Sequence, residues 1–419
     1  MADYTVLVVG GGGREHAVAW SLARSPQVRQ VYAAPGNAGT AQVGQNLPVG
    51  AEDISGIVQA ARDYVVDLVV VGPEAPLAAG LVDALTEAGI LAFGPTRAAA
   101  QLEASKAFAK AFMLEQGIPT ARYATFDRRD DALAYLDTID YPVVVKADGL
   151  AAGKGVIVCD HLDQARDAVR AMLEDASFGA AGARVIIEER LTGPELSVLA
   201  FCDGERAVLM PPTRDHKRIF DGDEGPNTGG MGAFGPVTDL APGLMATIIQ
   251  TIIEPTVRGM AARGTPYRGV LYAGLMLTPD GPRTLEFNCR FGDPEAQVVL
   301  PLLASDLFDI VKACAEGQLD PAAIHWYEGA CATVVAASAG YPGSYKKSLP
   351  IQGMDAVGNA LVFMAGVATV DGHFVTSGGR VVAVSGRGAT LDDALQVAYG
   401  GLENIHFEGM HYRKDIGRT

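Results

Sequence analysis

The sequence predicts a multidomain protein that combines an α/β domain with α+β domains, and three observations lead to this expectation. The chain has 419 residues, enough for roughly two to four domains at about 100–200 residues each. Its first hundred residues alternate short apolar runs with amphipathic stretches, which is typical of a parallel sheet covered by helices. Beyond Pro95, apolar runs follow one another through short Gly-rich loops, which indicates hairpins and a different topology.

The first domain is expected to comprise residues 1–102 and to contain a Rossmann-like parallel sheet. Its patterns predict strands at Val6–Gly10, Val31–Ala34, Asp67–Gly72 and Ile90–Phe93, and helices at Glu15–Arg24, Ile54–Tyr64 and Leu77–Ala88. In such a sheet, ligands bind beyond the carboxyl ends of the strands. The loops that follow these strands are therefore candidate binding segments.

The central domain is expected at residues 103–326, with a small mobile lid at about 122–190. A helix at Ala100–Gln116 should end at the Gly-then-Pro signal that follows it. The lid is expected to contain strands at Val143–Lys146, Val156–Val158 and Arg184–Glu189 and a helix at Leu162–Leu173. Further strands are predicted at Glu195–Ala200, Val270–Leu277 and Arg283–Asn288, around a long polar loop at Pro211–Pro236. A loop of that length is usually functional or disordered.

Residues 327–419 are expected to form a small α+β domain at the carboxyl end. The predicted strands are Ala332–Ala337, Val362–Thr369 and Arg380–Val384, and the predicted helix is Leu391–Leu402. We expect Ser377–Arg380 to lie near bound ligand, as part of a wall of the substrate cleft.

The composition indicates which kinds of partner the protein can bind. Lys and Arg number 33 against 49 Asp and Glu, a net charge of −16, and a surface this acidic repels nucleic acid. Apolar runs break before the ~18 residues that a membrane helix needs, and the amino terminus lacks the pattern of a secretory signal. The five cysteines form no Cys-x-x-Cys pair, which indicates reduced thiols. We therefore expect a cytoplasmic protein with small-molecule partners, without nucleic acid or membrane.

A glycine-rich loop, Gly10–Gly13, follows the first strand and opens a helix. Backbone N–H groups there can receive a phosphate, so a phosphate-bearing ligand is favoured over a purely structural turn. The dinucleotide fingerprint is incomplete because the third glycine is missing, and the second strand ends in Ala33-Ala34-Pro35 without the expected acid. An NAD-dependent oxidoreductase is therefore disfavoured.

Two more glycine-rich loops occur in the central domain. Asp148–Gly155 lacks P-loop spacing and leads into a strand, so a hairpin lid over phosphates is favoured over a merely flexible surface hairpin. Lys146 supports this because a lysine at the end of an apolar run is costly to bury without an anionic partner. Gly225–Gly232 lies beside Asp215–Arg218, and a substrate-closing loop and a solvated loop are equally compatible with it.

The segment Thr284–Arg290 carries the strongest chemical pattern. Strand alternation places Glu286, Asn288 and Arg290 on one face, with Leu285, Phe287 and Cys289 in the core. The carboxylate and carboxamide suit Mg²⁺ held together with substrate phosphates, and Arg290 suits a carboxylate. The alternative is an ordinary half-exposed sheet face. None of the seven histidines occurs in a recognisable catalytic context.

Motifs along almost the whole chain carry a family resemblance. They are Gly12–His16, Pro35–Thr40, Val71–Pro76, Ser105–Phe108, Lys146–Gly155, Asp215–Arg218, Gly225–Ala233, Glu286–Glu295 and Arg413–Gly417. In this order, they resemble the phosphoribosylamine–glycine ligase (glycinamide ribonucleotide synthetase) family of the ATP-grasp superfamily. The resemblance implies an ATP-grasp central domain with its lid, and ATP-dependent ligation of glycine to 5-phosphoribosylamine through a glycyl phosphate in purine synthesis.

The resemblance also implies roles for particular residues, with ATP as co-substrate and Mg²⁺ or Mn²⁺ as cofactor. The metal would bind Glu286 and Asn288, and the catalytic pair would be Arg290 and Asp215, at glycine's carboxylate and ammonium. ATP would contact Lys106, Lys146, Gly149, Ala151, Ala152, Gly153, Lys154, Gly155, Glu188, Glu189, Leu191 and Glu195. Phosphoribosylamine would contact Gly12, Gly13, Asn37, Gly39, Thr40, Pro73 and Glu74. The enzyme is expected to be a monomer.

Two other hypotheses remain open at this point. One is an ATP-grasp ligase with a different acid or amine, which the amino-terminal loops disfavour because Gly36–Thr40 and Pro73–Pro76 look matched to phosphoribosylamine. The other is a nucleotide-binding regulatory protein without turnover. Loss of activity should first remove metal or lysine positions, yet Glu286, Asn288, Lys106 and Lys146 are all present.

Overall fold

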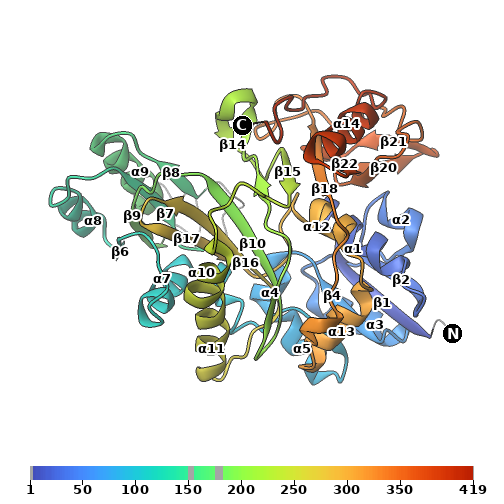
Figure 1. The fold of residues 1–419 in the computed structure, drawn as a ribbon, viewed down its shortest axis with the longest axis horizontal. Coiled ribbons are helices and arrows are strands. Elements are labelled where there is room, and N and C mark those ends of the chain that lie inside the picture. The colour runs from blue at the N-terminus through green and yellow to red at the C-terminus, as the bar shows by residue number, and fades with distance from the viewer. Residues whose placement is uncertain (1–2, 150–154, 175–182, 419) are drawn as a thin grey trace.

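The structure is a computed structural model that describes residues 3–149, 155–174 and 183–418 (Figure 1). Within these ranges, helices that combine the length and apolar character needed to cross a membrane are absent. Figure 1 shows the amino-terminal domain in blue at the lower right and the lid in teal at the far left. The carboxyl-terminal domain lies in red at the upper right.

The amino-terminal domain contains the predicted parallel sheet. Its strands are β1 (Tyr4–Gly10), β2 (Val28–Pro35), β3 (Gln45–Asn46), β4 (Leu68–Val71) and β5 (Leu91–Phe93), in the order β3-β2-β1-β4-β5. Its helices are α1 (Gly13–Ala23), α2 (Thr40–Val43), α3 (Ile54–Asp63), α4 (Glu74–Ala79) and α5 (Leu81–Glu87). The strand order reverses at β1, so the loops after β1, β2 and β4 meet at one sheet edge.

Two predicted helices are each divided in the structure. The helix expected at Leu77–Ala88 becomes α4 and α5 because Gly80 adopts φ +95°, which ends one helix and starts the next. The helix expected at Ala100–Gln116 becomes α6 (Gln101–Ala104) and α7 (Lys106–Glu115). Ser105 between them is extended, and its side chain accepts a hydrogen bond from Phe108 N as the cap of α7. Both single-helix predictions were therefore wrong at the junction.

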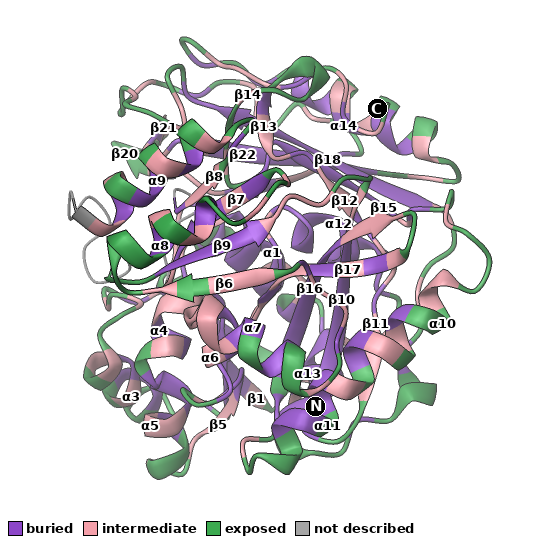
Figure 2. Cartoon of the chain, turned by 90° about the vertical axis from the view of Figure 1, so that its left-hand side faces the viewer, coloured by how far each residue is buried: buried purple, intermediate pink, exposed green. Residues whose placement is uncertain are grey.

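The central domain is built on an antiparallel sheet in the order β11-β10-β16-β17. The strands are β10 (Glu195–Asp203), β11 (Ala207–Leu209), β16 (Arg268–Thr278) and β17 (Gly281–Asn288). Figure 2 shows β10 and β16 largely buried, in purple, which agrees with their nearly continuous apolar sequences. The sequence patterns missed α10 (Leu244–Ile248), the π-helix η3 (Ile249–Ile253), α11 (Glu254–Ala262), α12 (Ala296–Leu302), α13 (Leu307–Glu316) and the short 3₁₀ turn η4 (Pro321–Ala323).

The lid is a second, smaller sheet with its own core. Its strands are β6 (Tyr123–Phe126), β7 (Val143–Ala147), β8 (Val156–Val158) and β9 (Val185–Glu189), in the order β6-β9-β7-β8, and its helices are α8 (Arg129–Leu136) and α9 (Leu162–Glu174). The predicted β7–β8 hairpin is confirmed. Buried residues such as Ala132, Val145 and Val169 join both helices to the sheet in a cluster separate from the main core.

The carboxyl-terminal sheet includes strands from the central segment of the chain. Its order is β12-β15-β18-β22-β19, from β12 (Arg214–Asp215), β15 (Gly232–Gly235), β18 (Ala330–Ala337), β22 (Arg380–Gly388) and β19 (Leu361–Met364). The remaining elements are β13 (Arg218–Phe220), η2 (Asp221–Asp223), β14 (Glu224–Asn227), β20 (Val367–Val370), β21 (His373–Thr376) and α14 (Leu391–Leu402).

Two expectations for this region were wrong. Pro211–Pro236 is not one loop but contains four short strands, because β15 pairs with both β12 and β18, and β13 pairs with β14. These partners supply hydrogen bonds that the Gly-rich sequence does not predict. The strand expected at Val362–Thr369 is divided into β19 and β20. At the division, Gly366 approaches Gly378 so closely that a Cβ on Gly366 would lie 2.5 Å from the Cα of Gly378.

Candidate active site

The face of β17 that carries Glu286 and Asn288 is half-buried, and the opposite side packs into the core. Phe287 and Cys289 are each 2% exposed, as the alternation predicts. Leu285 is only half-buried, because the register between β16 and β17 shifts at this point and leaves Leu285 without a paired residue. This bulge turns the carbonyl of Leu285 toward Lys146, whose Nζ lies 3.3 Å away.

The donor set on this face fits a hard divalent cation. The carboxylate of Glu286 has neither a hydrogen bond nor an ion pair with any described residue, and the nearest polar contact of Asn288 Oδ1 is a long 3.5 Å approach from Arg290. Two oxygens on one strand face leave several positions of an octahedral ion for substrate phosphates. Glu286 and Asn288 are therefore suited to hold a metal together with a nucleotide.

Three lysines surround this face. Lys106 opens α7 and donates to the carbonyl of Gly149 at 2.8 Å. Burial lowers the pKa of the Lys106 ammonium, although the charge of Glu286 acts in the opposite direction. Lys110 lies one turn further along α7, is 2% exposed, and was not predicted as a site residue. Its i,i+4 spacing from Lys106 was the available signal, since residues at that spacing share a helix face.

Glu188 lies between two of these lysines. Its Oε2 is 2.9 Å from Lys110 Nζ and 3.0 Å from Lys146 Nζ. Burial alone would raise the pKa of the Glu188 carboxyl, but the two cations outweigh it and lower that pKa. Lys146 thus has the anionic partner that its burial requires, and within the described chain that partner is a protein carboxylate. The second oxygen, Oε1, is buried and accepts no hydrogen bond from any described residue.

The neighbouring predicted ATP contacts diverge from Glu188. Glu189 occupies the opposite face of β9 and forms a two-pronged ion pair with Arg122 at 3.0 and 3.1 Å. Leu191 is half-buried in the segment after β9. The structure therefore brings Glu188, but not the side chain of Glu189, to the lysines. Of the hairpin tip, Ala151, Ala152, Gly153 and Lys154 lie outside the described residues, and Gly155 accepts a hydrogen bond from Ala147 N across the base of the hairpin.

A separate acidic group surrounds Lys217, which was also not predicted as a site residue. Lys217 Nζ is 2.5 Å from Glu195 Oε2 and 2.9 Å from Asp215 Oδ1. Burial lowers the pKa of Lys217, but Asp215 and Glu195 outweigh it and raise that pKa well above its ordinary value. The sequence Asp215–Arg218 was recognised as charged, but only the folded structure shows that Asp215 and the distant Glu195 share Lys217 as their cation.

Arg290 is held by two carboxylates from different parts of the chain. Its Nε lies 3.3 Å from Glu74 Oε2, and its Nη2 lies 3.0 Å from Glu103 Oε1. Glu74 is the first residue of α4 in the amino-terminal domain, so this contact joins the end of β17 to the start of the helix that follows β4. Glu103 was not predicted as a site residue, and burial raises the pKa of its carboxyl.

Arg290 and Asp215, both within the described residues, form no hydrogen bond or ion pair with each other. Glu295 interacts electrostatically with both of them. Burial raises the pKa of Glu295 to about 7, and the charge of Asp215 adds to this effect. Ser197 donates to Glu295 Oε1 at 3.1 Å, and its Oγ lies 2.8 Å from the hydroxyl of Tyr272. Glu295 is a buried, proton-binding carboxyl that the sequence interpretation did not single out.

At the amino-terminal loops, much of the glycine-lined space is filled by Glu15. Its Oε2 accepts a hydrogen bond from Gly12 N at 2.6 Å, and its Oε1 is 2.6 Å from Arg14 Nε. A Cβ on Gly10 would lie 2.5 Å from the Glu15 side chain. The loop therefore accommodates an internal carboxylate, while Gly13 lies beside Gln297 of α12.

The polar groups of Asn37–Thr40 are hydrogen-bonded largely to one another and to neighbouring protein groups. Asn37 Nδ2 donates to the carbonyls of Gly11, Gly12 and Met364 at 3.0, 3.2 and 2.7 Å, and Asn37 Oδ1 accepts from Gly39 N and Thr40 N. Thr40 Oγ1 bonds Asn46 at 2.7 Å, and Pro73 caps α4 beside Gly10. These residues lie together, as expected, but the side chains of Asn37 and Thr40 already have protein partners.

His16 and Arg380 connect these loops to the carboxyl-terminal domain. His16 Nδ1 accepts a hydrogen bond from Met364 N at 2.9 Å, and burial lowers the pKa of the imidazole to about 4. His16 is therefore neutral and structural. Arg380 forms an ion pair with Asp293 at 3.1 Å and donates to the carbonyls of Gly229 and Asp293. The Ser377–Arg380 segment thus reaches both the Gly225–Gly232 loop and the turn after β17.

Comparisons with known proteins agree along the length of the chain. Models of the phosphoribosylglycinamide synthetase N domain, ATP-grasp (A) domain and C domain match residues 4–103, 104–296 and 331–419. A phosphoribosylamine–glycine ligase of Ralstonia nicotianae is 51% identical over 98% of both chains. The trifunctional purine biosynthetic protein adenosine-3 of Gallus gallus is 52% identical over 100% of this chain, which spans only 42% of that longer protein.

Solved structures are similar as well. The crystal structure of phosphoribosylamine–glycine ligase from Thermotoga maritima has a TM-score of 0.88 and 36% identity, covering 99% of this chain and 100% of that one. A biotin carboxylase from Campylobacter jejuni, at 14% identity and a TM-score of 0.74 over 97% and 92% of the two chains, shares the fold alone.

The matched domains and the lysine- and carboxylate-bearing sheet define an ATP-grasp ligase, a class that forms C–N bonds and uses ATP with a divalent metal ion. Its substrates are small molecules. Within this class, the chain belongs to the phosphoribosylamine–glycine ligase family, the phosphoribosylglycinamide synthetases.

Proposed function

We propose that this enzyme joins glycine to 5-phosphoribosylamine in de novo purine synthesis, consuming ATP and releasing ADP, phosphate and glycinamide ribonucleotide. The observation that carries the proposal is the ion pair between Arg290 and Glu74. It joins the end of the candidate metal-binding strand to the loops at the carboxyl ends of the amino-terminal sheet. An acid activated beside β17 would therefore lie next to loops suited to a phosphorylated amine.

The reaction has two steps in this proposal. A carboxylate oxygen of glycine attacks the γ-phosphorus of ATP, and ADP leaves, which converts a poor electrophile into glycyl phosphate. The amine nitrogen of phosphoribosylamine then attacks the carbonyl carbon and loses a proton, while phosphate leaves with the electron pair of the C–O bond. Both steps depend on positioning and neutralisation of charge rather than on a protein nucleophile.

Cationic and metal-binding groups would act on the phosphates. Lys106 and Lys146 would hold phosphate oxygens, and Glu286 and Asn288 would hold Mg²⁺ or Mn²⁺, which neutralises phosphate charge. The hairpin Gly149–Gly155, with Ala151, Ala152, Gly153 and Lys154, would close over the phosphates. Glu188, Glu189 and Leu191 would border the adenine, and Glu195 the ribose. For Glu188, the unpaired Oε1 supports this role, since a buried acceptor needs a donor.

Glycine and phosphoribosylamine would bind beyond the end of β17, between Arg290 and the amino-terminal loops. Asp215 would hold the ammonium of glycine. Arg290 donates through both Nη atoms and Nε to its protein partners, so about two of its five N–H groups would remain for the glycine carboxylate. At Gly12, Gly13, Asn37, Gly39, Thr40, Pro73 and Glu74, we expect backbone N–H groups to hold phosphoribosylamine, because the Asn37 and Thr40 side chains are already bonded.

The proposal extends to organisation and location. The domains would divide at 1–102, 103–326 with a lid at about 122–190, and 327–419, and the enzyme would act as a monomer. A cytoplasmic location is supported by the five cysteines, all of which are free thiols and buried.

The decisive experiment measures ADP release from Mg-ATP and glycine, with and without phosphoribosylamine formed in situ from ribose 5-phosphate and ammonia. Release that requires both substrates, with glycinamide ribonucleotide as the product, is the expected result. Release that ignores phosphoribosylamine would indicate another amine acceptor. Folded protein that binds ATP without any release would indicate a regulatory protein instead.

A further inference from the structure

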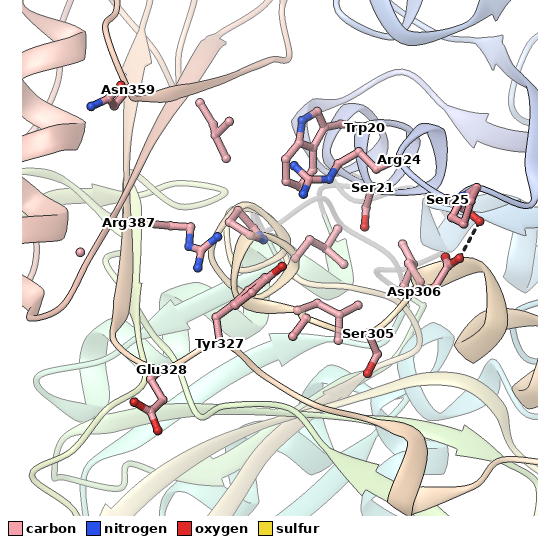
Figure 3. A pocket seen from close by; sticks show the side chains of 18 of the residues that line it. Trp20, Ser21, Arg24, Ser25, Ser305, Asp306, Tyr327, Glu328, Asn359 and Arg387 are labelled. Atoms are coloured by element: carbon pink, nitrogen blue, oxygen red, sulfur yellow. Dashed lines mark hydrogen bonds between the residues drawn. The ribbon is translucent and has the colours of Figure 1, made fainter.

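A cavity of about 650 Å³ lies between α1, the end of α12 and the carboxyl-terminal sheet (Figure 3). Both helices begin at the candidate active site, α1 after Gly12 and α12 after Glu295, and both end at this cavity. Since α1 has 11 residues, the cavity lies roughly 16 Å from the amino-terminal loops at about 1.5 Å per residue. It is therefore a separate site.

Two arginines line the cavity, and each has its guanidinium group over an aromatic ring. The guanidinium carbon of Arg24 is 4.7 Å from the ring centre of Trp20, and that of Arg387 is 4.3 Å from the ring centre of Tyr327. Figure 3 shows both guanidinium groups pointing into the space between them. Each cation is attracted to the face of its ring, and these contacts hold the two guanidinium groups at the cavity.

Neither guanidinium has a carboxylate partner or a side-chain hydrogen bond among the described residues. The two acidic residues at the cavity, Asp306 and Glu328, are not partners of these arginines. Asp306 is occupied by Ser25 Oγ at 2.6 Å and by Phe308 N at 2.9 Å, and Glu328 points away from the arginines in Figure 3.

We propose that this cavity binds a nucleoside monophosphate. The two unpaired guanidinium groups match the two charges of a phosphate monoester and can grip its oxygens in a two-pronged geometry. A base can stack on the open face of a guanidinium plane, as bases do in other proteins. Leu300, Leu303 and Leu361 supply an apolar floor, and Asn359 supplies a donor and an acceptor for the ribose or base edge. The volume lies within the range of about 300–1,000 Å³ usual for small-molecule sites.

The inference extends beyond the proposed ligase reaction, and the tryptophans make it testable. The chain has two tryptophans, and only Trp20 lines the cavity. In a full-length Trp326→Phe protein, Trp20 fluorescence therefore reports on this cavity. AMP is titrated while a saturating Mg²⁺ complex of a non-hydrolysable ATP analogue occupies the ATP site, and calorimetry measures the affinity independently. Adenosine and inorganic phosphate serve as comparison ligands.

Saturable quenching by AMP is expected, with adenosine and phosphate each binding at least about tenfold more weakly. Arg24→Gln and Arg387→Gln should each weaken AMP by about tenfold or more, since each removes a charge-assisted contact. Arg258→Gln, at an exposed arginine on α11, should change nothing. Both cavity arginines are exposed, so these variants should fold. Absence of saturable binding at millimolar AMP, equal binding of phosphate alone or adenosine alone, or binding that both cavity substitutions leave unchanged would overturn the proposal.

Discussion

Replacement of Glu188 by Gln is expected to destabilise the protein strongly, because one carboxylate neutralises two buried lysines. Glu188 Oε2 lies 2.9 Å from Lys110 Nζ and 3.0 Å from Lys146 Nζ, and each side chain in the cluster is less than one-tenth exposed. Removing one partner from a buried ion pair typically costs about 3–5 kcal/mol. The amide keeps the shape of the side chain, so the loss reports on charge rather than on packing.

The loss should depend on pH in a defined direction. Burial lowers the pKa of Lys110 to about 8, with Glu188 holding it from falling further. Without Glu188 the folded-state pKa falls below 8, while the unfolded chain keeps an ordinary lysine pKa. Between this lower pKa and pH 8, the folded variant binds fewer protons than its unfolded chain, whereas the folded wild type does not. The stability of the variant therefore rises with pH in this interval, and that of the wild type does not. The deficit should shrink as the pH rises toward 8.

Thermal and denaturant unfolding of Glu188→Gln at several pH values measures this effect. Glu189→Gln is the matched control, since it makes the same change on the next residue of β9, where the partner Arg122 is exposed. It should change stability little. Equal effects of the two substitutions, or a Glu188→Gln deficit that grows from pH 6 to pH 8, would refute the reasoning.

Two further predictions concern the reacting end of β17. Glu286→Gln should abolish turnover and leave the unfolding temperature nearly unchanged, because the carboxylate forms no hydrogen bond or ion pair with a described residue; near-normal activity at limiting Mg²⁺ would contradict the metal assignment. Burial raises the pKa of Glu295 to about 7, so the folded state holds a proton that the unfolded chain releases near pH 4.5. That stabilising contribution should be fully present below pH 4.5 and decline up to pH 7, whereas Glu295→Gln should lack this decline in pH-dependent unfolding. If the stability of the wild type and of Glu295→Gln depended on pH in the same way, this prediction would be wrong.

Much of the fold follows from local patterns. The apolar run Val6–Val9 is completely buried in the central position of its sheet, and strand alternation placed Phe287 and Cys289 in the core. Local propensity did not reveal the positions at which a single residue divides an expected helix. Gly80 and Ser105 each divide an expected helix, and β15 forms in a glycine-rich segment only because β18 pairs with it. Strand formation there depends on a distant partner rather than on its own sequence.

In the candidate site, sequence motifs likewise did not reveal which charged residues contact one another. The motifs identified Lys146, Glu188, Arg290 and Glu74 as site residues, but as contacts to ligands rather than as partners of one another. The structure joins them in pairs, Lys146 with Glu188 and Arg290 with Glu74, and adds Lys110, Glu103 and Lys217. A lysine or glutamate in a sequence has no assigned counter-charge, so a single chain cannot tell a ligand-binding cation from one neutralised by the protein.

The amino-acid sequence by itself determined the layered domains, the glycine loops after the strands and the oxygen donors on one face of β17, because these depend on periodicity over a few residues. Only the tertiary structure decided which charges are paired, which glycines make room for Glu15, and that Arg24 and Arg387 meet across one cavity. Electrostatic partnership and burial are set by distances in space between residues far apart in the chain, and folding alone brings those residues together.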